Sequence, residues 1–123
     1  MQKTLNLSGR ILFALPFLLF GLNHLYNYNE ILPVVPAFIP GGVLWVWLSG
    51  LAMIFAAFAI VGEKHEDIAC IAMAVLLLAH IATVHFPELI NPQKSLLTWI
   101  SLLKDVGLMG AALYMAGNAK KNP

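Results

Sequence analysis

Lys104 and Asp105 are adjacent charged residues in the middle of an apolar run, residues 96–117, that is long enough to cross a bilayer. A spanning helix needs roughly 20 apolar residues. An ionised side chain near the bilayer centre costs roughly 2.5–3.5 kcal/mol on insertion scales. The two charges therefore neutralise each other, pair with another helix, or face a polar cavity. Neighbours on a helix project about 100° apart, so at most one of them points at the axis of a bundle.

Three other polar residues, Asn23, His24 and His80, are predicted to lie at nearly the same depth. At about 1.5 Å per residue, His80 lies roughly 18 Å from the start of its span, and Lys104 lies roughly 12–14 Å from the opposite surface. Each has a structural alternative. His80 can bond a backbone carbonyl or Thr83, and Asn23 and His24 can cap the first helix.

The chemistry of these five residues favours a polar pocket for a quinone head group. A neutral histidine and a buried lysine can donate hydrogen bonds to carbonyl oxygens, and an adjacent aspartate can accept or pass a proton. Apolar walls around such groups suit a ring and its tail. We therefore expect the ligand contacts to come from Asn23, His24, His80, Lys104 and Asp105.

No metal site is expected. His80 and His85 project about 140° apart on a helix, so they cannot chelate one ion together. A pair of haem ligands would have to come from different helices, such as His24 and His80. No phosphate-binding loop or nucleotide fingerprint is present. We predict that the protein has no cofactor of its own and that a quinone is its candidate ligand, and no catalytic residue is assigned.

Composition defines the fold class. The chain has 123 residues, of which 60% are hydrophobic and only 11% are charged, whereas a soluble domain carries about 25% charged residues. The net charge of +1 gives no reason to expect a nucleic-acid partner. Four apolar segments predict an all-α polytopic membrane protein, a four-helix bundle in a single domain, residues 1–123, with spans at about 8–26, 43–62, 68–86 and 96–117.

The basic residues indicate the orientation of the bundle. If the spans alternate, five of them lie on one side: Lys3, Arg10, Lys64, Lys120 and Lys121. The other connections hold only Lys94. The positive-inside rule then predicts cytoplasmic N- and C-termini, with Arg10 reaching the inner headgroups. An aromatic belt agrees, because these rings gather at the opposite interface: Tyr26, Tyr28, Trp45, Trp47, Phe86 and Trp99.

Two further features concern packing and access. Small residues four apart let helix backbones approach closely, and such pairs occur at Gly107 and Ala111, at Ala112 and Ala116, and at Ala52 and Ala56. The first outer connection, residues 33–42, contains three prolines, which prevent a regular helix. We expect it to lie in the membrane interface, with a lid over the mouth of the bundle as the alternative.

Several short motifs resemble the DoxX family of small four-helix bacterial membrane proteins. They are residues 10–17 (RILFALPF), 20–24 (FGLNH), 40–43 (PGGV), 84–87 (VHFP), 102–105 (LLKD) and 110–113 (GAAL). The resemblance covers nearly the whole chain. It implies an inner-membrane protein and, from the quinone-linked oxidoreductase for which the family is named, association with membrane redox systems. It also marks Arg10, His24, Lys104 and Asp105 as positions that look characteristic of the family.

Two functions follow as expectations. The first is a small subunit of a quinone-linked membrane redox system that contributes a polar pocket. The second is a non-catalytic accessory or assembly subunit of a larger membrane complex. The expected partners are lipid and either other membrane subunits or further copies of the chain. A transporter ranks last, because four short helices leave little room for alternating access.

Overall fold

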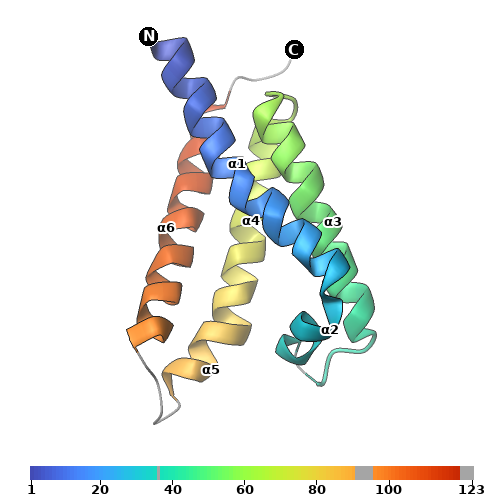
Figure 1. Ribbon diagram of the computed structural model, residues 1–123. Coiled ribbons are helices and arrows are strands. Elements are labelled where there is room, and N and C mark those ends of the chain that lie inside the picture. The colour runs from blue at the N-terminus through green and yellow to red at the C-terminus, as the bar shows by residue number, and fades with distance from the viewer. Residues whose placement is uncertain (36, 91–95, 120–123) are drawn as a thin grey trace.

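The computed structural model describes residues 1–35, 37–90 and 96–119. Their regular structure is entirely helical, which confirms the predicted fold class (Figure 1). The elements are α1 (Gln2–Tyr26), α2 (Tyr28–Ile31), η1 (Leu32–Val34), α3 (Gly42–Val61), α4 (Glu66–His80), η2 (Ile81–His85), α5 (Phe86–Leu89) and α6 (Leu96–Asn118).

In the described part of the chain, four helical segments are long and apolar enough to cross a membrane: Gln2–Tyr26, Gly42–Val61, Glu66–Val84 and Leu96–Asn118. The protein is therefore a multi-pass membrane protein whose outward faces contact lipid. The predicted spans differ from the observed helices mainly at the start of the first span and near the end of the third. The first helix begins at Gln2 and continues through Pro16. The third span changes from α-helical to π-helical after His80, at η2.

The bundle consists of two helix pairs. α1 packs mainly against α3, and α4 packs mainly against α6, while the contact between the pairs comes chiefly from α3 and α4. Figure 1 shows α1 crossing obliquely in front of α4, with α6 at the left of the view and α3 at the right. We call the end with the N-terminus and the α3–α4 turn the terminal end, and the end with α2 and α5 the loop end.

The first pair is joined by a close crossing at Gly21 and Gly50, both buried. A Cβ added to Gly21 would lie 2.7 Å from the carbonyl oxygen of Gly50 and 2.7 Å from Cγ1 of Ile54. A Cβ added to Gly50 would lie 2.8 Å from Cβ of His24. Glycine is required at both positions because the two backbones touch, and this contact fixes where α1 presents His24.

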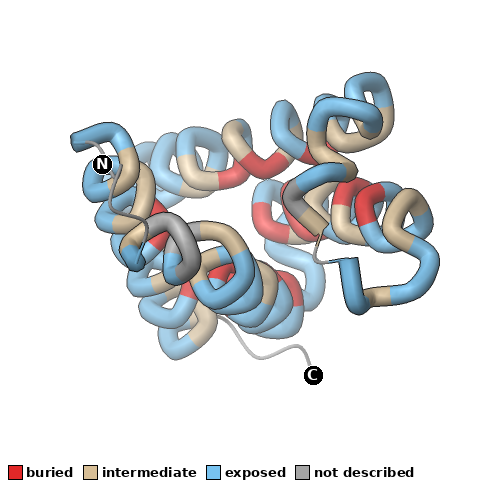
Figure 2. Tube along the Cα trace, turned by 90° about the horizontal axis from the view of Figure 1, so that it is seen from below, coloured by how far each residue is buried: buried red, intermediate tan, exposed pale blue. Residues whose placement is uncertain are grey.

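The packed core lies toward the terminal end. Its fully buried side chains include Ile60, Cys70 and Met73, with Phe17 and Ala112 beside them. Figure 2 shows the buried positions facing neighbouring helices, while the outward faces are exposed. The exposed faces carry large apolar side chains such as Phe55 and Leu97, as expected for surfaces that lie in lipid. Toward the loop end the two helix pairs leave a cavity.

Candidate functional site

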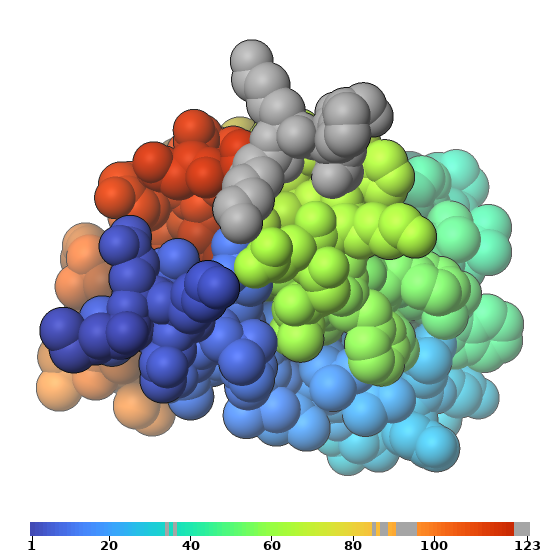
Figure 3. All heavy atoms as spheres, turned by 90° about the horizontal axis from the view of Figure 1, so that it is seen from above, coloured from blue at the N-terminus to red at the C-terminus, as the bar shows by residue number. Residues whose placement is uncertain are grey.

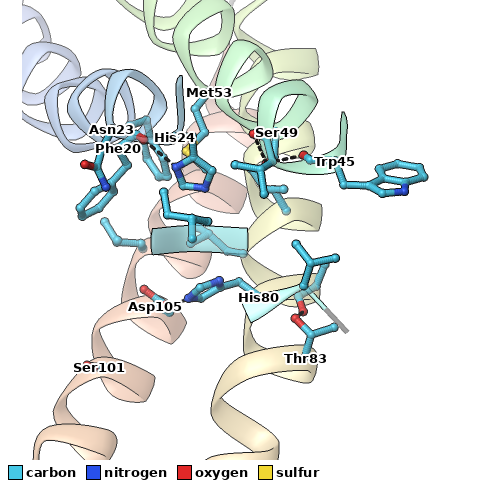
Figure 4. A pocket seen from close by; sticks show the side chains of 18 of the residues that line it. Phe20, Asn23, His24, Trp45, Ser49, Met53, His80, Thr83, Ser101 and Asp105 are labelled. Atoms are coloured by element: carbon cyan, nitrogen blue, oxygen red, sulfur yellow. Dashed lines mark hydrogen bonds and ion pairs between the residues drawn. The ribbon is translucent and has the colours of Figure 1, made fainter. Parts of the chain in front are cut away.

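A cavity of about 520 Å³ lies between the helix pairs toward the loop end. Its size is in the range of small-molecule sites. Every long helix contributes to it, together with the connection between α1 and α3 (Figure 4). Its wall is mostly apolar and includes Phe17, Phe20, Ile31, Val35, Ile39, Trp45, Val46, Met53, Leu76, Leu77 and Leu108.

All five predicted ligand-contact residues line this one cavity: Asn23, His24, His80, Lys104 and Asp105. They come from three helices that are distant in the sequence. Figure 4 shows His24 projecting from α1 into the space that His80 and Asp105 approach from the other side. The polar groups therefore face a shared volume, as the depth estimates predict.

His80 and Asp105 form a polar contact between α4 and α6. His80 Nε2 lies 3.7 Å from Asp105 Oδ2. The Asp105 side chain is 10% exposed, whereas that of His80 is 48% exposed. A carboxylate buried to this degree needs charge or hydrogen-bond partners. Asp105 is thus the member of the charged pair that points into the bundle, and His80 offers it an imidazole at the same depth.

Lys104 points elsewhere. Its Nζ lies 5.7 Å from the centroid of the Phe20 ring, a distance at which a cation is attracted to the face of an aromatic ring. Phe20 and Lys104 are both exposed and both line the cavity. Because Phe20 belongs to α1 and Lys104 to α6, this contact links the two helix pairs at the cavity wall.

Asn23 and His24 make hydrogen bonds within their own segment. His24 Nδ1 lies 2.7 Å from the carbonyl oxygen of Phe20, and Asn27 Nδ2 donates to Asn23 Oδ1 at 2.6 Å. These bonds match the alternative in which both residues stabilise the end of the first helix. His24 nevertheless has a second ring nitrogen on the far side from its own helix, and His24 lines the cavity.

The sequence reasoning missed the π-helical turn η2, which directly follows His80. π-Helical turns inside α-helices are frequent at functional sites. Thr83, in this turn, donates its hydroxyl hydrogen bond to the carbonyl oxygen of Ala79 at 2.8 Å. Other residues that line the cavity were missed because nothing in the sequence distinguishes them from the rest of their spans. They are Phe20, Ser49, Met53, Thr83 and Ser101.

Residues 33–42 have a clear relation to the cavity. Val35 and Ile39 line it, together with Ile31 just before them. The indole Nε1 of Trp45 donates a hydrogen bond to the carbonyl oxygen of Pro40 at 2.9 Å, which ties this connection to the start of α3. Residue 36 lies outside the described residues. The described part of the connection thus forms one apolar wall of the site.

Arg10 lies in a separate cluster at the terminal end. Its Nη1 is 2.9 Å from Glu63 Oε1, and its Nε and Nη2 are 3.2 and 3.3 Å from the two carboxylate oxygens of Glu66. Figure 3 shows the α3–α4 turn, in yellow-green, beside α1 at this end. The sequence reasoning missed both carboxylates as partners, and the predicted headgroup contact of Arg10 stays a prediction.

Among residues 1–35, 37–90 and 96–119, no three His, Cys, Asp or Glu side chains are grouped so that they could hold a metal ion. Comparison with known proteins finds no matching family model, no similar curated protein and no similar solved structure. The resemblance to the DoxX family therefore stays a prediction from the sequence motifs.

Proposed function

We propose that this protein is a DoxX-like subunit of a quinone-linked membrane redox system and that it holds the quinone ring in the cavity between its helix pairs. The convergence of Asn23, His24, His80, Lys104 and Asp105 on one mostly apolar cavity carries this proposal. A lipid-soluble ring needs apolar walls, and its oxygens need a few fixed polar groups. The cavity supplies both within the thickness of the membrane-spanning helices.

The proposed membrane is the bacterial inner membrane, with both termini in the cytoplasm. The terminal end carries Lys3, Arg10 and Lys64, and the loop end carries aromatic rings. Tyr28 and Trp47 contact each other there edge to face, with ring centroids 5.6 Å apart. Both signals support a cytoplasmic terminal end. Lys94, Lys120 and Lys121, which also enter the charge count, lie outside the described residues.

Direct binding tests the proposal. Purified protein in lipid nanodiscs should bind a short-chain benzoquinone, and H80L should weaken the affinity by about tenfold, the loss expected for one hydrogen bond between the imidazole and a quinone oxygen. The matched control is H65N, because His65 lies on the α3–α4 turn outside the cavity and asparagine tolerates its positive φ of 55°. Equal affinity of H80L and the unmodified protein would count against a head-group site at His80.

An accessory role is the second candidate, and α6 favours it. The buried residues of α6 are Asp105 and Ala112. A Cβ added at Gly107 or Gly110 would meet no atom within 4 Å. The predicted small-residue pair at Gly107 and Ala111 therefore leaves an uncovered face on which another transmembrane helix can pack closely.

Purification from the native membrane in mild detergent separates the two candidates. Stoichiometric redox subunits or bound quinone support the first. A quinone-free protein that co-purifies with a complex lacking redox centres supports the second, and its buried charges then have a structural role. Recovery only as a monomer or homo-oligomer, never with other subunits, contradicts the second.

A further inference from the structure

The hydrogen bond of His24 to its own helix fixes which ring nitrogen carries the proton. The partner of Nδ1 is the carbonyl oxygen of Phe20, at 2.7 Å. A carbonyl oxygen can only accept a hydrogen bond, so Nδ1 must donate and carry the hydrogen. In a neutral imidazole the other nitrogen is then an acceptor. His24 therefore presents the lone pair of Nε2, on the side of the ring away from α1.

Asp105 adds a second acceptor to the same cavity. An ionised carboxylate accepts hydrogen bonds and donates none. Its Oδ2 lies 3.7 Å from His80 Nε2. A protonated His80 imidazole in this position would balance the negative charge of the carboxylate. The Lys104 ammonium is the strong donor of the set, and it lies over the Phe20 ring at the wall. The groups that face the cavity from α1 and α6 thus include two acceptors, His24 Nε2 and the Asp105 carboxylate.

The remainder of the wall favours an aromatic ring. Phe17 and Phe20 come from α1, Met53 from α3, and Leu108 from α6. Aromatic and thioether groups pack well against a flat ring. The volume of about 520 Å³ accommodates a substituted benzene ring together with the first part of an apolar chain.

We propose that the cavity selects a ligand with a phenolic O–H, the reduced or quinol form of a quinone, and that His24 Nε2 accepts the hydrogen bond from this hydroxyl. This inference rests on the proposed function and specifies its ligand. A quinone carbonyl offers only an acceptor to His24, so two lone pairs would face each other. A quinol hydroxyl satisfies the imidazole, and its ring lies against the apolar wall.

The test compares three ligands with the same ring carbons and side chain: a short-chain benzoquinone, its quinol, which carries two more electrons and two more protons, and the dimethyl ether of that quinol, in which methyl groups replace the two hydroxyl hydrogens. Dissociation constants are measured under anaerobic conditions with the full chain in nanodiscs. The quinol should bind about tenfold more tightly than either the quinone or the ether, because only the quinol can donate to His24. The ether comparison uses the unmodified protein and so does not depend on a variant folding.

A variant at His24 tests whether this residue causes the preference for the quinol. H24L keeps the Cβ that lies against Gly50 but removes the acceptor, so the three ligands should then bind with similar affinity. H65N should keep the preference for the quinol. If the quinone or the ether binds as tightly as the quinol, the inference is overturned while the proposed quinone-linked function stands. If none of the three binds, both are overturned.

Discussion

Replacing Arg10 with methionine should lower the free energy of unfolding by about 3–5 kcal/mol, the cost of removing one partner of a buried ion pair. The Arg10 side chain links α1 to the α3–α4 turn and the start of α4, and it is 15% exposed. Its partner Glu66 is only 6% exposed, so the carboxylate depends on the two hydrogen bonds from Arg10 Nε and Nη2. Without the guanidinium, a desolvated negative charge stays about one helical turn from the core residue Cys70.

Two comparisons make this experiment specific. Glu63 also pairs with Arg10, but its side chain is 44% exposed, so E63Q should cost only about 0–1 kcal/mol. The double variant R10M/E66M replaces both charged groups with flexible apolar side chains and should regain most of the loss. Unfolding is followed by far-UV circular dichroism in mixed detergent–SDS micelles. An R10M variant no less stable than E63Q would show that the Arg10–Glu66 pair contributes little.

The helices and the depth of the polar residues could be predicted because both depend on local sequence. Residues 96–117 correspond closely to α6, Leu96–Asn118, since apolar length sets a spanning helix. A fixed rise per residue then places His80 and Asp105 at one level, and the structure brings them within 3.7 Å. The angular difference between neighbours likewise explains why Asp105 is buried and Lys104 is exposed.

The pairing of distant residues could not be predicted in this way. Arg10 and Glu66 are separated by 56 positions, and only the packing of α1 beside the α3–α4 turn brings them together. The tautomer of His24 follows from a hydrogen bond to Phe20 that helix counting does not reveal. The π-helical turn after His80 is a backbone rearrangement with no clear sequence signal at 81–85.

The close helix crossing also escaped the sequence pattern. Of the three small-residue pairs that the spacing predicts, two contribute a buried residue, Ala56 and Ala112, whereas Gly107 is open and the tightest backbone contact lies at Gly21 and Gly50. A contact made by a single glycine from α1 and a single glycine from α3 gives no spacing signal within either helix. The contact matters for the site, because Gly21 and His24 lie on the same helix and Gly50 lies against the Cβ of His24.

Gly21 is accordingly the position where one methyl group should have the largest effect on packing. In G21A the new Cβ would lie 2.7 Å from the Gly50 carbonyl oxygen, and a backbone atom cannot rotate away as a side chain does. The helices must separate, so we expect a loss of about 1–3 kcal/mol in unfolding free energy. Separation also shifts α1 in the cavity, so the affinity for the proposed quinol ligand should fall together with the stability.

G107A is the matched control. It adds the same methyl group to a helical glycine, but no atom lies within 4 Å of the new Cβ. Alanine restricts the unfolded chain more than glycine does, so G107A should leave stability unchanged or raise it by about 0.5–1 kcal/mol. The same SDS titration compares the two variants, and ligand binding is measured in parallel. If G21A is as stable as G107A and binds quinol normally, α1 and α3 do not need their close approach to shape the cavity.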